Sequence, residues 1–189
     1  SRVTVLISPE DDTELRTVTL HNSGTTMRSL ELVSYFEPVL SNPKADEAHP
    51  AFANLFVQTR WMPSLRALML SRKPRLHGDA VMAAAHFLAS TDAHVLSVDC
   101  VADRRAFIGR NGRLAMPALG AQPLAADGSP VNGLDPIACL RVRLSIAAGA
   151  TARVTFATAA ADHVDALEPM IDRYLQSMHV ERASRMAEI

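Results

Sequence analysis

The sequence contains little cysteine, few aromatic residues and no excess of charge of either sign. Its 189 residues include two cysteines, one tryptophan, two tyrosines and six phenylalanines, and 20 acidic against 19 basic side chains give a formal net charge of -1. A chain with such balanced charge has no general attraction for polyanions. We therefore expect neither nucleic acid nor an anionic membrane surface as a partner.

Metal-binding patterns and long hydrophobic runs are missing too. Seven histidines are scattered, and there is no C-x-x-C or H-x-x-x-H pattern, so we expect no metal site and no cofactor. No apolar run reaches the roughly 18 residues that cross a bilayer. The start, Arg2-Val-Thr-Val5, is not a signal peptide. These absences predict a soluble domain that does not insert directly into a membrane.

The two cysteines, Cys100 and Cys139, each lie inside an apolar run. A free cysteine in such surroundings behaves as a small buried hydrophobe. We expect both thiols to be free, with a disulfide between them as the less favoured alternative.

Alternation of apolar and polar residues predicts a mostly β protein. Residues 3–20, interrupted by a turn at Ser8–Asp12, predict a first hairpin, and residues 140–156 predict a second one. Residues 30–36 are apolar on both faces for part of their length, which predicts a strand in the interior of a sandwich. Further strands are predicted over residues 53–59, 64–71 and 95–102, the last with Leu96, Val98 and Cys100 on one face.

Three other stretches depart from this alternation. Residues 80–89 are rich in alanine, which favours helix, but they lie between strands, so helix and strand both remain open. Residues 109–133 are rich in glycine, alanine and proline and predict a long surface loop. From Asp162 onward apolar residues recur at three and four positions, which predicts a terminal helix with Asp162 as its cap and a kink or restart at Pro169.

The segment between residues 37 and 52 carries Asp46, Glu47 and His49. Three prolines punctuate it, and because proline fixes φ, the segment is expected to hold one shape, as a binding loop does. A rigid connection between two sandwich strands is the alternative.

Several stretches resemble the cyclic β-1,2-glucan synthases, and they occur in the same order. They are residues 28–40, 45–59 and 71–75, then Asp103-Arg104, Phe107-Ile-Gly-Arg110, Leu134-Asp-Pro-Ile137 and Val180-Glu-Arg-Ala183. The resemblance covers nearly the whole chain, and its most diagnostic parts are residues 46–56 and 107–110.

The resemblance implies a two-sheet antiparallel super-sandwich of the galactose mutarotase-like kind. In that family the sandwich belongs to a region similar to cellobiose and chitobiose phosphorylases and precedes an (α/α)6 barrel, which holds the general acid. We accordingly expect residues 1–160 to form the second half of the sandwich, and residues 161–189 to be a helical connector toward that barrel. The fragment itself is then not an enzyme.

The same resemblance describes the parent protein. It would be a glycosyltransferase and glycoside phosphorylase that builds a β-1,2-glucan from UDP-glucose and trims the chain. The resemblance also implies a parent associated with the inner membrane, with this domain on the cytoplasmic side. Strands missing from the sandwich would leave sheet edges exposed, which predicts self-association.

A neutral glucan is bound by aromatic faces and by side chains that hydrogen-bond its hydroxyls. The candidates here are Trp61, Arg72, Arg75, Asp46, His49 and Arg110. Each has a structural alternative. Trp61 would pack in the core or at an edge, Arg72 and Arg75 would lie in a solvated loop, His49 would fix its loop by a hydrogen bond, and Arg110 would form an ion pair with Asp103 or Asp135. Asp46 and Glu47 are adjacent and point apart in an extended loop, so they are not expected to be a catalytic pair.

Three functions are compatible with these features. The leading one is a non-catalytic, carbohydrate-binding or scaffolding module whose ligand is a β-1,2-glucan or a related glucoside. The second is a module for dimerisation or for docking onto the barrel, without sugar affinity. The third, a hydrolase or epimerase, requires an acid–base pair that the sequence does not offer.

Overall fold

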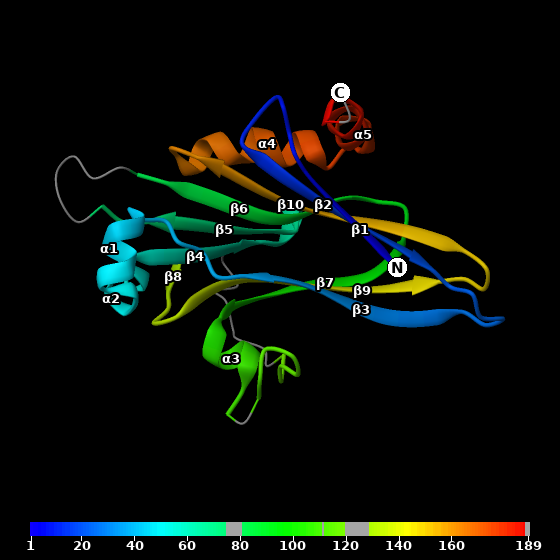
Figure 1. The fold of residues 1–189 in the computed structure, drawn as a ribbon, viewed down its shortest axis with the longest axis horizontal. Coiled ribbons are helices and arrows are strands. Elements are labelled where there is room, and N and C mark those ends of the chain that lie inside the picture. The colour runs from blue at the N-terminus through cyan, green and yellow to red at the C-terminus, as the bar shows by residue number, and fades with distance from the viewer. Residues whose placement is uncertain (75–80, 111, 120–128, 188–189) are drawn as a thin grey trace.

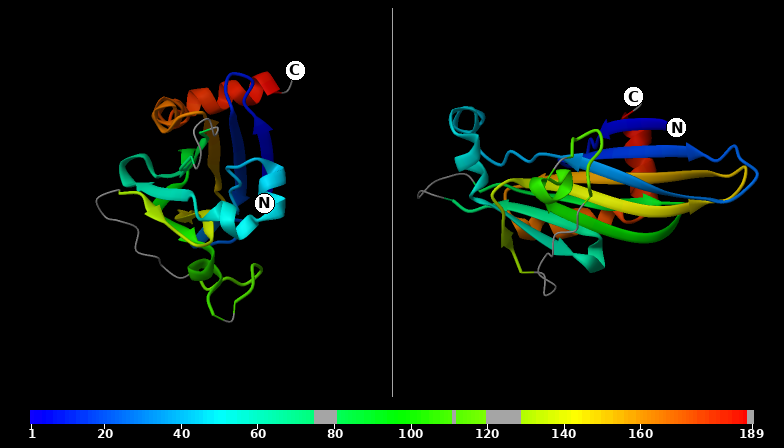
Figure 2. Two further views of the ribbon diagram at one scale, coloured as in Figure 1. Left: turned by 90° about the vertical axis from the view of Figure 1, so that its left-hand side faces the viewer. Right: turned by 90° about the horizontal axis from the view of Figure 1, so that it is seen from below.

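The computed structural model describes residues 1–74, 81–110, 112–119 and 129–187. Two antiparallel sheets face each other, and two helices cover the outer face of the larger sheet, as Figures 1 and 2 show. The mostly β, two-sheet architecture with helical structure at the C-terminus is therefore confirmed. Within the described residues, no helix has both the length and the apolar character that crossing a bilayer requires.

The larger sheet has the strand order β1-β2-β10-β6-β5-β4-β8, and the smaller one has the order β3-β9-β7. The strands of the larger sheet are β1 (Arg2–Ile7), β2 (Thr13–His21), β4 (Val57–Met62), β5 (Ala67–Arg72), β6 (Ala83–Thr91), β8 (Val131–Asn132) and β10 (Thr151–Ala161). Those of the smaller sheet are β3 (Arg28–Phe36), β7 (His94–Asp103) and β9 (Pro136–Ile146). The helices are α1 (Pro43–Ala48), α2 (Pro50–Asn54), α3 (Arg104–Ile108), α4 (Leu167–Tyr174) and α5 (Ser177–Ala187), with 3-10 turns at Pro63–Leu65 and Val164–Ala166.

Two main apolar clusters hold these layers together. The first lies between the sheets and includes Leu68, Leu88, Leu140, Val142 and Phe156. The second lies between the larger sheet and helices α4 and α5 and includes Leu15, Phe87, Leu167, Ile171 and Tyr174. The larger sheet is thus covered on both faces over much of its area.

The alanine-rich stretch is a strand because both of its faces are buried. Residues 83–89 of β6 are all buried, with Leu88 facing the smaller sheet and Phe87 facing the helices. Intrinsic helix propensity is weak, and packing between two layers overrides it.

The first predicted hairpin is confirmed, because β1 pairs antiparallel with β2. The second predicted hairpin is wrong. Strands β9 and β10 follow each other in sequence but belong to different sheets, so residues 147–150 cross from one sheet to the other. Asn22 fixes this corner, since its Nδ2 donates to the carbonyl oxygens of Ile146 and Ala147 at 3.0 Å each.

The predicted interior position of residues 30–36 is also wrong, because β3 is an edge strand of the smaller sheet. The two faces of β3 pack against different parts of the protein. Leu30 and Leu32 pack against the core between the sheets, whereas Tyr35 packs beneath α3.

Several strand boundaries differ from the prediction for local reasons. Pro50 begins helix α2, so the strand predicted from residue 53 begins at Val57. The next strand begins at Ala67, after Arg66 takes the left-handed conformation with φ of 49°. In β7 the register shifts between Val95 and Ser97, and Leu96 is 55% exposed instead of sharing the core face of Val98 and Cys100.

The C-terminal segment forms two helices instead of one. The predicted cap at Asp162 is wrong, because a 3-10 turn with His163 at its N-cap precedes α4. Pro169 lies in the first turn of α4, where a missing N–H costs no intrahelical hydrogen bond. In the predicted 109–133 loop, Val131–Asn132 forms β8, while residues 111 and 120–128 lie outside the described residues.

Polar contacts attach helices α4 and α5 to the turn between β1 and β2. The Tyr174 hydroxyl lies 2.7 Å from Ser8 Oγ and 2.8 Å from Asp11 Oδ1, and Arg173 pairs with Asp11 at 2.7 Å. Arg182 of α5 pairs with Glu10 at 2.7 Å. The helices are therefore fixed at the end of the sheet as well as on its face.

We expect Tyr174→Phe to lower the free energy of unfolding by about 1–2 kcal/mol, because it removes the hydroxyl that hydrogen-bonds Ser8 and Asp11. Denaturant unfolding measures this change. Tyr35→Phe is the control, since it removes a hydroxyl whose hydrogen bond to Glu37 is exposed, and it should cost less. Equal effects of the two substitutions would contradict the anchoring role of Tyr174.

Candidate functional site

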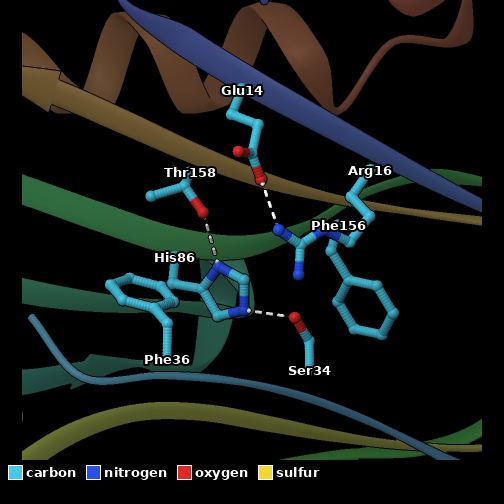
Figure 3. A pocket seen from close by; sticks show the side chains of 7 residues that line it. All are labelled: Glu14, Arg16, Ser34, Phe36, His86, Phe156 and Thr158. Carbon is cyan, nitrogen blue, oxygen red and sulfur yellow. Dashed lines mark hydrogen bonds and ion pairs between the residues drawn. The ribbon is translucent and has the colours of Figure 1, made fainter. Parts of the chain in front are cut away.

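A cavity of about 200 Å³ lies where the two sheets meet beside β3 (Figure 3). Both sheets contribute to its wall. The lining residues are Glu14, Arg16, Ser34, Phe36, His86, Phe156 and Thr158. We refer to it as the Glu14–His86 cavity.

Sheet register explains why these residues meet. Thr158 of β10 is directly opposite Glu14 of β2 on one side and His86 of β6 on the other. Residues directly opposite each other project to the same face of a sheet. Arg16 and Phe156 are also directly opposite each other, and they form the next row on the same face of the sheet. The polar and aromatic groups are therefore placed by backbone pairing rather than by loops.

The imidazole of His86 is the buried polar centre of the cavity, with 2% of the residue exposed. Nδ1 lies 3.1 Å from the carbonyl oxygen of Ala157 and 3.0 Å from Thr158 Oγ1, and Nε2 lies 3.0 Å from Ser34 Oγ. Because a carbonyl oxygen only accepts, Nδ1 carries the proton and Nε2 accepts from the Ser34 hydroxyl. Both ring nitrogens are thus satisfied in the neutral form.

The surroundings of His86 oppose its protonation. Burial lowers its pKa from 6.5 to about 4; the hydrogen bond to Ala157 opposes this shift, and the positive charge of Arg16 adds to it. Phe36 lies edge-on to the ring at 5.2 Å, and Phe156 is stacked at 6.2 Å. The imidazole is consequently a neutral hydrogen-bonding group in an aromatic setting.

The outer rim of the cavity is charged and accessible. Arg16 Nη2 lies 2.9 Å from Glu14 Oε1, and their side chains are 42% and 34% exposed. A guanidinium donates and a carboxylate accepts, and the aromatic side chains of Phe36 and Phe156 line the same cavity. This combination suits a ligand that has both hydroxyl groups and apolar C–H surface.

Protonation of His86 should destabilise the fold at acid pH. Below about pH 6.5 the unfolded chain binds a proton that folded His86, with a pKa of about 4, does not bind, so the free energy of unfolding should fall as the pH decreases between these values. The largest expected slope is about 1.4 kcal/mol per pH unit. Urea unfolding at a series of pH values, compared with His86→Gln, measures it.

The exposed His21 provides the matched control. His21→Gln should keep the wild-type slope, whereas His86→Gln should flatten it. Identical slopes for wild type and His86→Gln would rule out the burial of a neutral imidazole.

The predicted binding loop contains two short helices. Pro43 and Pro50 occupy the first positions of α1 and α2, where proline is tolerated, so these prolines start helices instead of stiffening a loop. Asp46 is half-buried in α1. His49 is exposed at the N-cap of α2, where its carbonyl oxygen accepts hydrogen bonds from Phe52 and Ala53. Within the described residues its side chain makes no hydrogen bond, so the predicted loop-fixing bond is absent.

Trp61 and Arg72 lie on neighbouring strands of the larger sheet. Trp61 is half-buried and packs against the core between the sheets. Arg72 lies with its guanidinium carbon 5.9 Å from the centre of the Phe56 ring. Arg72 is thus close to the end of α2, while Arg75 lies outside the described residues.

The predicted ion pair of Arg110 is wrong for both proposed partners. Asp103 Oδ1 accepts from the backbone N–H of Ala106 and caps α3, and Asp135 lies 3.8 Å from Arg104. Arg110 is exposed and makes no ion pair within the described residues. None of the five described candidates lines the Glu14–His86 cavity.

Residues 34–37, 103–110 and 134–137, which carried part of the resemblance, meet around α3. The Tyr35 and Phe107 rings stack with 4.7 Å between their centres, and Arg104 Nε lies 3.0 Å from Glu37 Oε1. Burial and the hydrogen bond to Glu37 raise the pKa of Tyr35 to about 12. Gly109 ends α3 with φ of 75°, and a Cβ there would lie 2.6 Å from that of Ala118.

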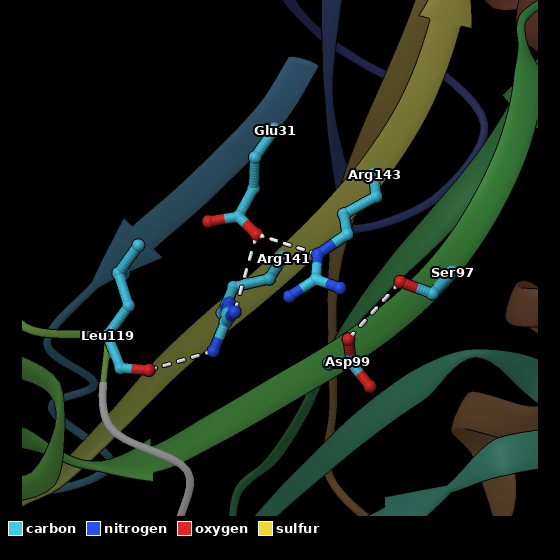
Figure 4. A network of polar contacts seen from close by, with 6 residues as sticks. All are labelled: Glu31, Ser97, Asp99, Leu119, Arg141 and Arg143. Carbon is cyan, nitrogen blue, oxygen red and sulfur yellow. Dashed lines mark hydrogen bonds and ion pairs between the residues drawn. The ribbon is translucent and has the colours of Figure 1, made fainter. Parts of the chain in front are cut away.

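A charged group on the outer face of the smaller sheet holds the segment after α3 (Figure 4). Arg141 donates to the carbonyl oxygen of Leu119 at 2.8 Å, and Arg141 and Arg143 both donate to Glu31. Hydrogen bonds from these arginines lower the pKa of Glu31, although its partial burial acts in the opposite direction. The group therefore positions a surface segment, although the buried Arg141 Nε has no hydrogen-bond partner within the described residues.

The thiols are free, as predicted, and belong to the apolar clusters. Cys139 is buried and Cys100 is half-buried. Burial raises the pKa of both thiols, that of Cys139 to about 12, so neither is a reactive nucleophile.

The sequence did contain a signal for the cavity. Glu14 and Arg16 continue the alternation of Val18 and Leu20 on β2, and they put charged residues on the face that packs against the smaller sheet. A charged pair on such a face indicates a place where the core is interrupted. The scattered histidines, by contrast, gave no reason to single out His86.

Comparisons with known proteins give two findings. A family model described as the glycosyl hydrolase 94 supersandwich domain matches residues 1–177. The chain is also 34% identical over 174 residues to the cyclic beta-(1,2)-glucan synthase NdvB of Rhizobium meliloti (strain 1021). That alignment covers 92% of this chain and 6% of the relative, so the chain spans a small part of the relative's length.

Proposed function

Since the chain belongs to the glycosyl hydrolase 94 supersandwich domain family, we propose that it is a non-catalytic, carbohydrate-binding and scaffolding module of a cyclic β-1,2-glucan synthase-like enzyme. The supporting observation is the Glu14–His86 cavity. The name of the relative indicates the proposed ligand class, a β-1,2-linked glucan.

The chemistry of the cavity supports binding of one sugar ring. Arg16 and Glu14 offer a donor and an acceptor for hydroxyl groups, and the rings of Phe36 and Phe156 offer apolar contact. Its volume of about 200 Å³ is below the roughly 300–1,000 Å³ of typical ligand pockets. A single glucosyl unit of a chain is therefore the proposed occupant.

The same lining argues against hydrolysis by this module. Glycosidases generally use two carboxylates across the scissile bond. Among the described lining residues, Glu14 is the single carboxylate. In the proposal, a barrel elsewhere in the parent carries out the chemistry, and residues 161–189 connect the sandwich to it. We also propose that the parent protein synthesises the glucan from UDP-glucose and trims the glucan chain. The parent is proposed to be associated with the inner membrane, with this domain in the cytoplasm.

Arg16→Ala tests the cavity as a glucan site. Calorimetric titration with linear β-1,2-gluco-oligosaccharides should give saturable binding to the wild type, with cellobiose binding more weakly. The substitution should weaken binding by about tenfold, because hydrogen bonds to a charged group contribute about 1.5–3 kcal/mol when fully formed. Trp61 fluorescence is a poor reporter, since Trp61 does not line the cavity.

Arg143→Ala is the matched control, because Arg143 is an exposed arginine on the outer face of the smaller sheet. It should bind like the wild type. If Arg16→Ala and Arg143→Ala bind equally, the glucan contacts lie elsewhere.

A second function, self-association, is supported by strand β1. Val3, Val5 and Ile7 are 58%, 51% and 63% exposed. They project to the face shared with Val18, which packs against the core between the sheets. β1 is an edge strand of the larger sheet, and an edge strand presents unpaired backbone groups. The proposed occupant is β1 of a second copy, paired antiparallel about a two-fold axis.

Val5→Lys should weaken this association, because it places a charge in the centre of the apolar edge. Light scattering during size-exclusion chromatography, over a range of concentrations, should show a dimer for the wild type and a monomer for the variant. Val33→Lys, on the exposed side of β3, is the control and should remain dimeric. A wild type that is monomeric at all concentrations would exclude this second function.

A further inference from the structure

A second cavity lies on the opposite face of the larger sheet, beside helix α5, and its volume is about 710 Å³. We refer to it as the α5 cleft. Strands β1, β2, β6 and β10 contribute to its wall together with α5. No residue of the Glu14–His86 cavity lines it.

The floor of the α5 cleft is a continuation of the surface on which the helices pack. One row across β1, β2 and β10 consists of Leu6, Leu15 and Ala157, and all three belong to the apolar cluster under α4 and α5. The next row on the same face consists of Thr4, Thr17 and Thr155, and the row after it consists of Arg2, Thr19 and Arg153. The face therefore changes from apolar to hydroxyl-bearing to basic over three rows.

Helix α5 supplies the facing wall. Ser177, Glu181 and Ser184 are separated by four and three residues, so they share one side of the helix. Val180 lines the same cleft and packs against the apolar cluster. The helix thus presents hydroxyl and carboxylate groups above the hydroxyl row of the sheet.

Many of these hydroxyl groups are available to a ligand. Thr17 Oγ1 and Thr155 Oγ1 lie 3.0 Å apart and satisfy each other. Within the described residues, the hydroxyls of Thr4, Thr19 and Ser184 make no hydrogen bond to the protein. A hydroxyl can donate and accept, as the hydroxyls of a sugar do.

Charge decides the class of ligand. Two basic residues, Arg2 and Arg153, and two acidic residues, Asp92 and Glu181, line the cleft, so its formal charge is zero. An anion or a cation would meet equal attraction and repulsion, whereas a neutral polyhydroxyl ligand can use both donors and acceptors. The volume of about 710 Å³ lies within the roughly 300–1,000 Å³ of ligand pockets and exceeds that of the Glu14–His86 cavity.

We infer that the α5 cleft is a second glycan subsite, which takes an extended segment of a neutral oligoglucoside. This inference rests on the proposed function, because it assumes that the domain binds glucan. The smaller cavity then holds one ring of a ligand, and the cleft, on the opposite face and with the larger volume, binds a longer segment more tightly than a disaccharide.

The test compares a disaccharide with a hexasaccharide, both linear and β-1,2-linked. The double variant Thr4→Val/Thr19→Val removes two free hydroxyls without removing an internal hydrogen bond, and valine suits a strand. Calorimetry should show the hexasaccharide bound about tenfold more weakly by the variant, with disaccharide binding unchanged. Ser29→Ala, which removes an exposed strand hydroxyl outside both cavities, is the control and should match the wild type.

Backbone NMR shifts locate the ligand independently of affinity. The hexasaccharide should shift the signals of Thr17, Ser177 and Ser184, and the disaccharide should not. If Arg16→Ala weakens disaccharide binding but Thr4→Val/Thr19→Val binds the hexasaccharide like the wild type, the inference is wrong and the proposed function stands. If the wild type binds neither oligosaccharide, both fail. If only the cleft variant loses binding, the cleft is the glucan site and the smaller cavity is not.

Discussion

The two-sheet arrangement depends on how the chain crosses from one sheet to the other, and Asn22 joins two of the crossings. One crossing follows β2 and the other precedes β10. The Asn22 amide donates to Thr26, Ile146 and Ala147, and its backbone N–H donates to Ala150. At 6% exposure, these groups have little access to water, so the protein must supply their partners. These hydrogen bonds hold the two sheets in one relative position. They therefore also hold the shape of the Glu14–His86 cavity, to which both sheets contribute.

The candidate site follows from that relative position. His86 and Glu14 lie on the larger sheet, whereas Ser34 and Phe36 come from the smaller one. Backbone pairing gives each residue its row, and the packing of the two sheets against each other brings these rows together. All of the described residues that line the cavity belong to strands instead of to a loop.

Period-two alternation allowed the fold class and most strands to be predicted, because it depends on local sequence. The pairing of strands could not be predicted in the same way. The turn at Gly149 has the composition of a hairpin, and it is a crossing because β10 pairs with β2 and β6 instead of with β9, an arrangement that the Asn22 contacts, 124 and 125 residues apart in sequence, support. The Glu14–His86 cavity also joins residues from four strands, β2, β3, β6 and β10, that belong to two sheets. The predicted candidates were chosen from loops and single aromatic residues, so this cavity was missed.

The pairing of β2 with β10 has a consequence for how the domain forms. Thr17 and Thr155, which contact each other across these strands, are 138 residues apart. Contacts of such long range form slowly, because closing the intervening chain costs entropy before the contact is made. During synthesis, β1 and β2 can form their hairpin early, but β2 cannot pair with β10 until β10 has left the ribosome. Until then the hairpin has an unpaired strand edge and the exposed valines of β1, which are features that favour aggregation and chaperone binding.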